Sequence, residues 1–166
     1  MRDDPMRALR DLVRGRDGGP DRRLDGFGAA DWGRYADLLA GVFLLAARRR
    51  FVAGQDRAPV IRFVAGVRER YDRSGRDVDP LVAEDLVWAA LGDRPPVPVS
   101  AAAVTAQTVL LLGLLEDEGM PATERDDLLD AAARTVRRPP ALAGPDPAAT
   151  EEGTAAVPPA AKPVTG

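Results

Sequence analysis

The chain of 166 residues contains no cysteine and no histidine. Without cysteine it has no disulfide, no thiol nucleophile and no thiolate metal site. Without histidine it lacks the commonest general base, the usual zinc ligand and the usual pH switch. No other arrangement of residues forms a catalytic constellation. The sequence therefore predicts a non-enzymatic protein that uses no cofactor and no metal.

Aromatic residues, lysine, isoleucine and asparagine are also scarce. Aromatics make up 5% of the chain, Lys162 is the only lysine, Ile61 is the only isoleucine, and asparagine is absent. With 45% apolar residues, the core must be built from Leu, Val and Ala, which favours helices over strands. Because Lys, Asn and Ile have AT-rich codons, the bias indicates a high-GC bacterial genome rather than a functional demand for arginine.

The sequence has no apolar run that predicts a membrane span. Residues 38–47 are uncharged and almost wholly apolar, but a span needs about 20 apolar residues. Residues 95–115 carry no charge, yet they begin with three prolines and are flanked by acids. Both runs predict core helices. The N-terminus shows no signal-peptide pattern, so we expect a cytoplasmic protein.

Apolar periodicity and capping residues predict a compact all-α bundle of four to five core helices. A short amphipathic helix with Met6, Leu9 and Val13 on one stripe precedes it. The expected core helices run over Ala30–Val52, from Asp56 to Asp72, from Asp79 to Gly92, from Ser100 through Leu115, and from a capping box at Thr123 and Asp126.

Composition divides the chain into three parts. Residues 1–28 are expected to form an N-terminal arm, with the short helix followed by a Gly/Asp/Arg-rich loop. Residues 29–138 form the helical bundle domain. Residues 139–166 are rich in Pro and Ala with few apolar anchors, which predicts a disordered tail.

Charge is divided along the chain. Residues 48–76 carry nine arginines against three acids, whereas residues 77–130 carry twelve acids against two arginines. These stretches are expected to be solvated faces that partly neutralise each other in the fold or in a dimer. Five arginines are the candidate partner-binding basic patch: Arg48, Arg49, Arg50, Arg57 and Arg62.

The acids over residues 116–130 are a weaker candidate site. Asp126, Asp127 and Asp130 have a spacing at which helical carboxylates can share a magnesium ion, but no second metal motif accompanies them. Acids in the first turns of a helix are also favoured by its dipole. Whether this acidic surface binds a cation stays open.

These observations favour a protein–protein interaction or regulatory adapter domain. Its partner is expected to be another protein or a second copy of the chain. The alternative is a small nucleic-acid-binding regulator that uses the Arg-rich segment 48–76 to contact phosphates. The acidic overall balance and the lack of aromatics among the arginines make that alternative the second choice.

Overall fold

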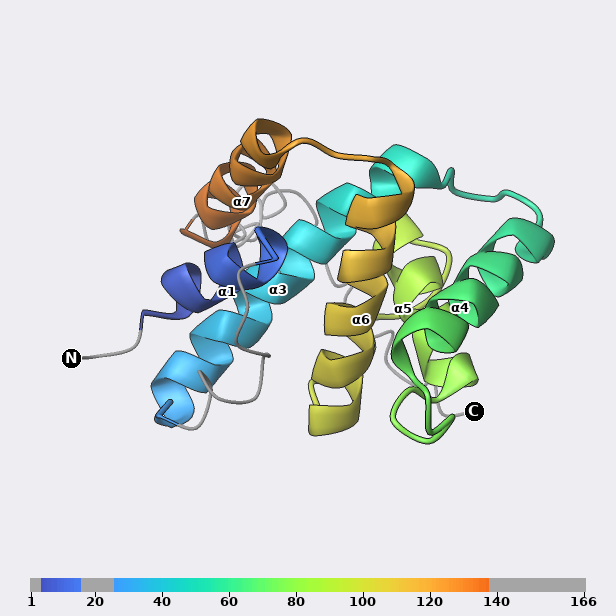
Figure 1. The fold of residues 1–166 in the computed structure, drawn as a ribbon, viewed down its shortest axis with the longest axis horizontal. Coiled ribbons are helices and arrows are strands. Elements are labelled where there is room, and N and C mark those ends of the chain that lie inside the picture. Colours follow the sequence, from blue (N-terminus) through green and yellow to red (C-terminus); the bar gives the residue numbers. More distant parts are fainter. Residues whose placement is uncertain (1–3, 16–25, 138–166) are drawn as a thin grey trace, which may run out of the picture.

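The computed structural model describes residues 4–15 and 26–137 (Figure 1). Over these ranges the chain forms helices and no strand, which confirms the predicted all-α bundle. The helices are α1 (Pro5–Val13), α3 (Ala29–Arg50), α4 (Arg57–Tyr71), α5 (Pro80–Leu91), α6 (Ala101–Asp117) and α7 (Ala122–Arg137). The predicted tail, residues 139–166, and most of the predicted Gly/Asp/Arg-rich loop lie outside the described residues.

Side-chain caps begin three helices where the sequence predicted them. The carboxylates of Asp56 and Asp79 and the hydroxyl of Ser100 accept hydrogen bonds from backbone N–H groups in the first turns of α4, α5 and α6. Those N–H groups have no partner inside the helix, so the caps fix where each helix starts. Gly92 ends α5 with φ of 85°, a left-handed conformation that glycine adopts without a Cβ clash.

The starts of α3 and α7 differ from the prediction. The cap position of α3 is taken by Gly28, while Asp31 lies in the first turn, where its charge still complements the helix dipole. Thr123 lies inside α7, and the Asp126 carboxylate accepts a hydrogen bond from Arg14, the residue directly after α1. A distant guanidinium has replaced the local capping box, a contact that sequence spacing does not reveal.

The helix α3 is central and crosses the bundle diagonally, in contact with α1, α5, α6 and α7 (Figure 1). The apolar run 38–47 lies in its second half, and Leu39 and Phe43 are at most 2% exposed. Burying such a side chain contributes about 1.5–3 kcal/mol. The run is therefore a core helix, as predicted. Among the described residues, no helix combines the length and apolarity needed to cross a bilayer.

The helix α1 packs into the bundle beside α3 and α7 (Figure 1). Leu9 and Val13 of α1 are fully buried. Arg125 of α7 donates a hydrogen bond of 2.8 Å to the Val13 carbonyl oxygen, at the end of α1. The structure therefore places α1 in the bundle, whereas the sequence set residues 1–28 apart as an arm. The apolar surface that buries Leu9 and Val13 is formed by helices distant in sequence.

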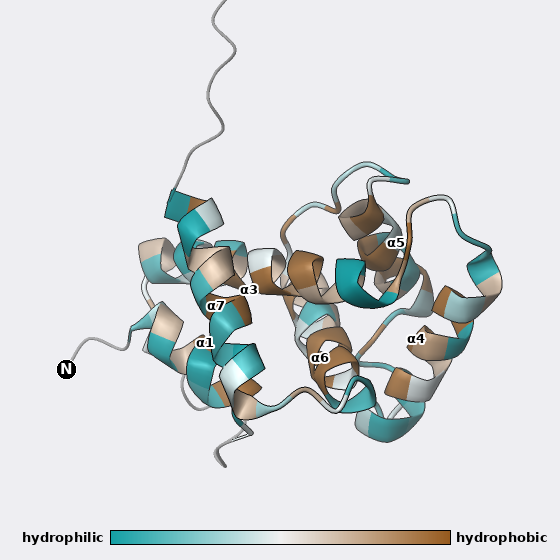
Figure 2. Cartoon of the chain, turned by 90° about the horizontal axis from the view of Figure 1, so that it is seen from above, coloured by the Kyte–Doolittle hydropathy of each residue, from teal (hydrophilic) through white to brown (hydrophobic). Residues whose placement is uncertain are grey.

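The other side of α3 is covered by α5 and α6, and α4 packs against these two helices (Figure 2). Apolar residues surround almost the whole circumference of α6, because α3, α4 and α5 all pack against it. Gly113 of α6 lies directly against the Val67 side chain of α4. Trp88 of α5 is buried. This half of the bundle also contains the turn, residues 51–56, that joins α3 to α4.

Candidate functional site

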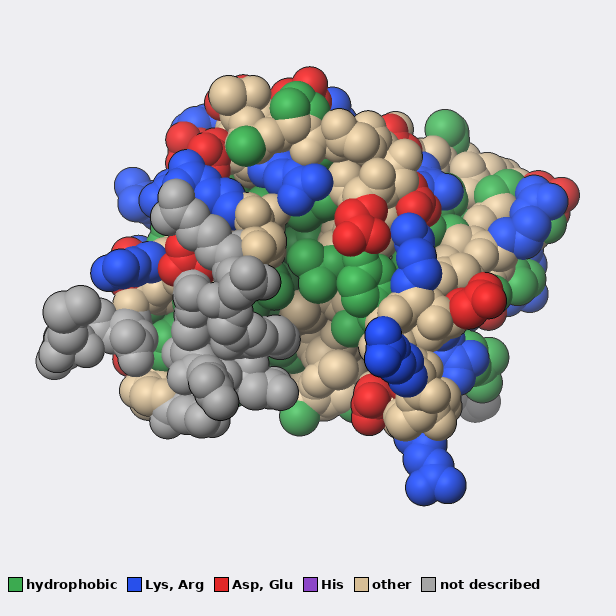
Figure 3. Space-filling model, in the orientation of Figure 1, with side chains coloured by type: hydrophobic (Ala, Val, Ile, Leu, Met, Phe, Trp, Pro, Cys, Tyr) green, Lys and Arg blue, Asp and Glu red, His purple; other side chains and the backbone are tan. Residues whose placement is uncertain are grey.

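The basic and acidic stretches of the sequence lie against each other in the fold. Arg49 and Arg50 of the basic stretch reach Glu124 and Asp117 of the acidic stretch, at 2.8 and 2.7 Å. Figure 3 shows basic and acidic side chains interspersed over one face rather than gathered into a single basic field. Mutual neutralisation within the fold, which the sequence predicted, is confirmed for these pairs. Hydrogen bonding from Arg14 also lowers the pKa of Asp126.

Arg48 begins the arginine triplet that closes α3. Cations in the last turn of a helix complement its negative dipole end, and all three arginines lie there. The Arg48 Nε donates a hydrogen bond of 2.7 Å to the carbonyl oxygen of Ala90, in the last turn of α5. Carbonyls at a helix end lack an intrahelical partner. Arg48 therefore joins the ends of two helices.

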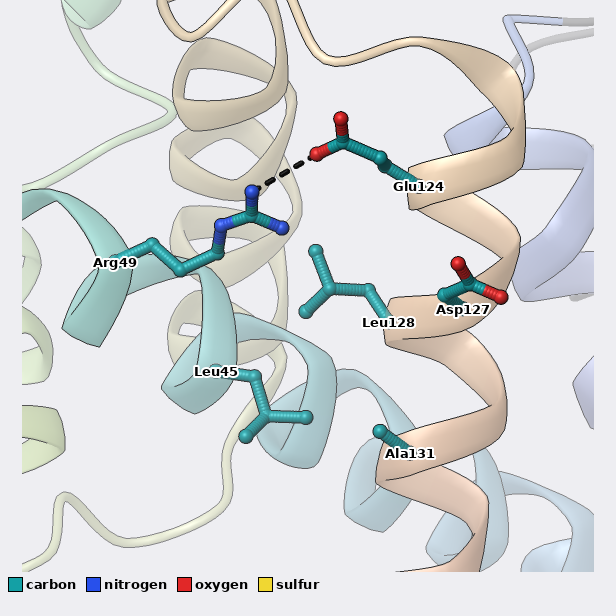
Figure 4. A pocket seen from close by; sticks show the side chains of 6 residues that line it. All are labelled: Leu45, Arg49, Glu124, Asp127, Leu128 and Ala131. Atoms are coloured by element: carbon teal, nitrogen blue, oxygen red, sulfur yellow. Dashed lines mark hydrogen bonds and ion pairs between the residues drawn. The ribbon is translucent and has the colours of Figure 1, made fainter.

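Arg49 points across a hollow toward α7 (Figure 4). Its Nη2 lies 2.8 Å from Glu124 Oε2, with both side chains about half exposed. Figure 4 shows this ion pair above Leu128 and Leu45. The hollow has a volume of about 290 Å³, and Ala131 and Asp127 complete its lining. An exposed pair of this kind contributes about 0–1 kcal/mol, but it does compensate the charge of Arg49.

Arg50 is held by an acid and two aromatic rings. Its Nη1 lies 2.7 Å from Asp117 Oδ2, and its guanidinium lies over Phe63 at 4.8 Å and Phe51 at 5.5 Å from the ring centroids. Arg70 Nη1 binds the other oxygen of Asp117 at 2.8 Å. Burial raises the pKa of Asp117, but the two guanidiniums outweigh it and leave that pKa below its ordinary value.

Arg57 and Arg62 of α4 are exposed and form no ion pair with any other residue that the structure describes. Two apolar side chains accompany them: Val52 is 70% exposed and Ile61 is 45% exposed. Arg57 and Ile61 are four residues apart and share one face of α4, and Arg62 follows Ile61. We call Val52, Arg57, Ile61 and Arg62 the α3–α4 corner.

A second hollow, of about 320 Å³, lies beside this corner. Its lining comprises Arg50, Phe51, Gln55, Pro59, Arg62 and Phe63. Gln55 Oε1 accepts a hydrogen bond from the Val52 N–H at 3.1 Å, while Gln55 Nε2 is covered and has no partner among the described residues. No acidic side chain lines this hollow. We call it the corner hollow.

The structure therefore separates the five arginines of the predicted basic patch. Arg48, Arg49 and Arg50 are engaged by α5, α7 and α6 respectively. Arg57 and Arg62 are available, and Arg50 and Arg62 line the same hollow. Sequence reasoning did not identify Gln55, Pro59 or Phe63 as site residues. They all lie within residues 50–63, where the chain turns from α3 into α4, but their spacing forms no motif that predicts a hollow.

Comparison of the chain with protein-family models, curated proteins and solved structures finds no match. The α3–α4 corner combines two exposed apolar side chains with the guanidiniums of Arg57 and Arg62, which have no acidic partner among the described residues.

Proposed function

We propose that this protein is a non-enzymatic interaction module that binds another protein through the α3–α4 corner. The observation that carries the proposal is that two exposed aliphatic side chains, Val52 and Ile61, lie in the same segment, residues 52–62, as the unpaired guanidiniums of Arg57 and Arg62. Arginine is enriched in protein interfaces, where it combines an apolar stem with a forked donor. Covering two aliphatic side chains supplies the hydrophobic part of the binding free energy.

The charge of the corner favours an acidic partner segment. Elsewhere on the bundle, arginines such as Arg14 and Arg49 already face acids of the same chain. At the corner, Arg57 and Arg62 do not. Charge complementarity selects the partner and accelerates its association more than it adds affinity. A segment that carries Asp or Glu next to aliphatic residues matches both features of the surface.

Nucleic-acid binding through residues 48–76 has less support. Five of its nine arginines already have partners within the chain. Arg48 binds the carbonyl of Ala90, Arg49 pairs with Glu124, and Arg50 and Arg70 share Asp117. Arg68 binds the carbonyl of Gly75 and pairs with Asp72. The remaining four are Arg57, Arg62, Arg73 and Arg76. Each phosphate contact contributes about 0.9 to the slope of log affinity against log salt concentration, so four contacts give only a modest salt dependence.

We place the module in the cytoplasm, because a chain without cysteine gains no disulfide from an oxidising compartment.

Affinity capture with matched variants tests the proposal. The full chain, an Arg57→Gln/Arg62→Gln variant and an Arg134→Gln/Arg137→Gln control serve as baits in nuclease-treated extract. The control removes the same charge from exposed positions on α7. We expect the wild type and the control to capture a partner protein that the corner variant does not capture. This partner, once purified, should bind the purified wild type in calorimetry. Equal retention by all three baits would contradict the proposal.

Nucleic acid is the other outcome to resolve. Without nuclease treatment, capture of DNA or RNA that is lost steeply with salt and abolished by the corner substitutions would favour the regulator alternative. Capture of the chain itself, checked by light scattering of the purified protein, would identify a second copy as the partner.

A further inference from the structure

The corner hollow is lined by hydrogen-bond donors and by no acid. Two guanidiniums and one amide face or border it, and two phenylalanines and a proline supply its apolar walls. Gln55 Oε1 is already occupied by the Val52 N–H. The side-chain polar groups that remain around the hollow are therefore donors, and a ligand that fills it has to bring acceptors.

These donors have unused capacity. Arg50 uses Nη1 for Asp117, and its other nitrogens make no hydrogen bond to any described residue. Arg62 makes none within the same ranges, and Gln55 Nε2 is covered without a partner. A covered donor that lacks an acceptor costs free energy. A ligand oxygen in the hollow would meet Arg62 and Arg50 directly, and a small movement of the Gln55 amide would let it join them.

The aromatic walls hold one of these donors in place. The rings of Phe51 and Phe63 meet edge to face at 5.4 Å between centroids, and both are about 4% exposed. Arg50 lies over both rings, so its guanidinium is oriented before any ligand arrives. Apolar walls also lower the local dielectric, which strengthens a charge-assisted hydrogen bond.

The hollow between α3 and α7 provides the contrast. There Arg49 already has Glu124 as its anion, and Asp127 adds a second acid to the lining (Figure 4). An external anion would have to displace Glu124 and approach Asp127. In the corner hollow, Arg62 carries a positive charge that no described residue compensates.

We propose that the corner hollow binds a carboxylate of the partner's acidic segment, carried on a short aliphatic stem. This inference rests on the proposed function and names the group that anchors the partner. A carboxylate matches the single uncompensated charge of Arg62, because Asp117 and Glu116 together already balance Arg50 and Arg70. A phosphate dianion would place surplus negative charge near Asp117. The aliphatic stem packs against Pro59 and the two phenylalanine rings.

A titration followed by ¹H–¹⁵N NMR tests the inference on the full chain. The probe is isobutyrate, the uncharged control is isobutyramide, and a third arm uses inorganic phosphate, all at pH 7 and constant ionic strength. We expect saturable shifts of the Phe51, Gln55 and Phe63 amide signals with isobutyrate and none with isobutyramide. Arg62→Gln weakens isobutyrate binding by about tenfold, whereas Arg134→Gln leaves it unchanged.

Three outcomes would overturn the inference. The first is the absence of saturable shifts at these amides, and the second is tighter binding of phosphate than of isobutyrate. The third is equal binding by wild type and Arg62→Gln. None of these decides the proposed function, because affinity capture depends on Val52, Ile61 and Arg57 as well. Equal retention of partners by all three baits, together with saturable isobutyrate binding by the wild type, would conversely refute the interaction module and leave the carboxylate site standing.

Discussion

Replacing Gly113 by alanine tests how closely α4 and α6 are packed. In a helix interior alanine is favoured over glycine by about 1 kcal/mol, so propensity alone predicts stabilisation. In the structure, a Cβ at Gly113 would lie under 3.0 Å from Val67 Cγ2 on α4. Valine has one strongly preferred rotamer in a helix and cannot turn away at low cost. Overpacking of this kind costs about 1–3 kcal/mol, so Gly113→Ala should destabilise the bundle.

The sign of the effect depends on Val67, which makes a double-mutant cycle decisive. In a Val67→Ala background the new methyl group has room, and Gly113→Ala should become neutral or stabilising, with a coupling of about 0.5–3 kcal/mol. Gly66→Ala is the matched control: it lies in a helix, and nothing is within 4 Å of its added Cβ. It should stabilise by up to about 1 kcal/mol.

Urea unfolding followed by circular dichroism measures all four variants and the wild type. If Gly113→Ala stabilised the protein as much as Gly66→Ala, and did so regardless of residue 67, then α6 would not approach α4 at this point. The described packing of the α4–α6 side would then be wrong.

Two further predictions concern the core and its charged ends. Phe43→Ala should lower the free energy of unfolding by about 3–5 kcal/mol, because the ring is 2% exposed. Arg49→Ala should lower it by less than about 1 kcal/mol, because the ion pair of Arg49 is half exposed. Urea unfolding measures both, and the reverse order would show that the run 38–47 lies on the surface. The second concerns Asp72: burial opposes its ionisation, but hydrogen bonds from the Val78 and Asp77 N–H groups and the Ser74 hydroxyl leave its pKa below the ordinary 3.8. A carboxyl whose pKa is lower in the folded state stabilises the fold at pH above its unfolded pKa, and this stabilisation is lost as the pH falls through the folded pKa. The wild type should therefore be more stable than Asp72→Asn near neutral pH and lose this difference in stability below about pH 4. A difference in stability that stayed constant with pH would contradict the prediction.

Local patterns in the sequence were sufficient for most of the helices. Asp79 and Ser100 cap the helices that they were predicted to cap, and α4 begins directly after Asp56 as predicted, because a side-chain cap depends only on neighbours within three residues. The apolar run before the arginine triplet indicated a core helix for the same reason, since its length and composition suit burial on all sides. The capping box at Thr123 failed where a distant residue competed, as Arg14 took the carboxylate of Asp126.

The candidate site was only partly predictable. Charge patterning identified Arg57 and Arg62, which are still available in the structure. It also grouped Arg49 and Arg50 with them. In the structure Arg49 pairs with Glu124 and Arg50 pairs with Asp117, and both acids are at least 67 residues away in sequence. Charge counts along a chain do not show which opposite charges meet. Pairing depends on the packing of whole helices.

The sequence by itself determined the helical class, most helix ends and the burial of α3, because propensity, capping and apolar periodicity are local properties. Only the tertiary structure decided that α1 joins the bundle, which arginines remain unpaired, and that Gln55, Pro59 and Phe63 share a hollow with Arg62. The hollow forms within residues 50–63, where the chain turns from α3 into α4. The other two depend on contacts between segments distant in sequence. Such contacts are selected by the packing of several helices around one core, and no short stretch of the chain encodes them.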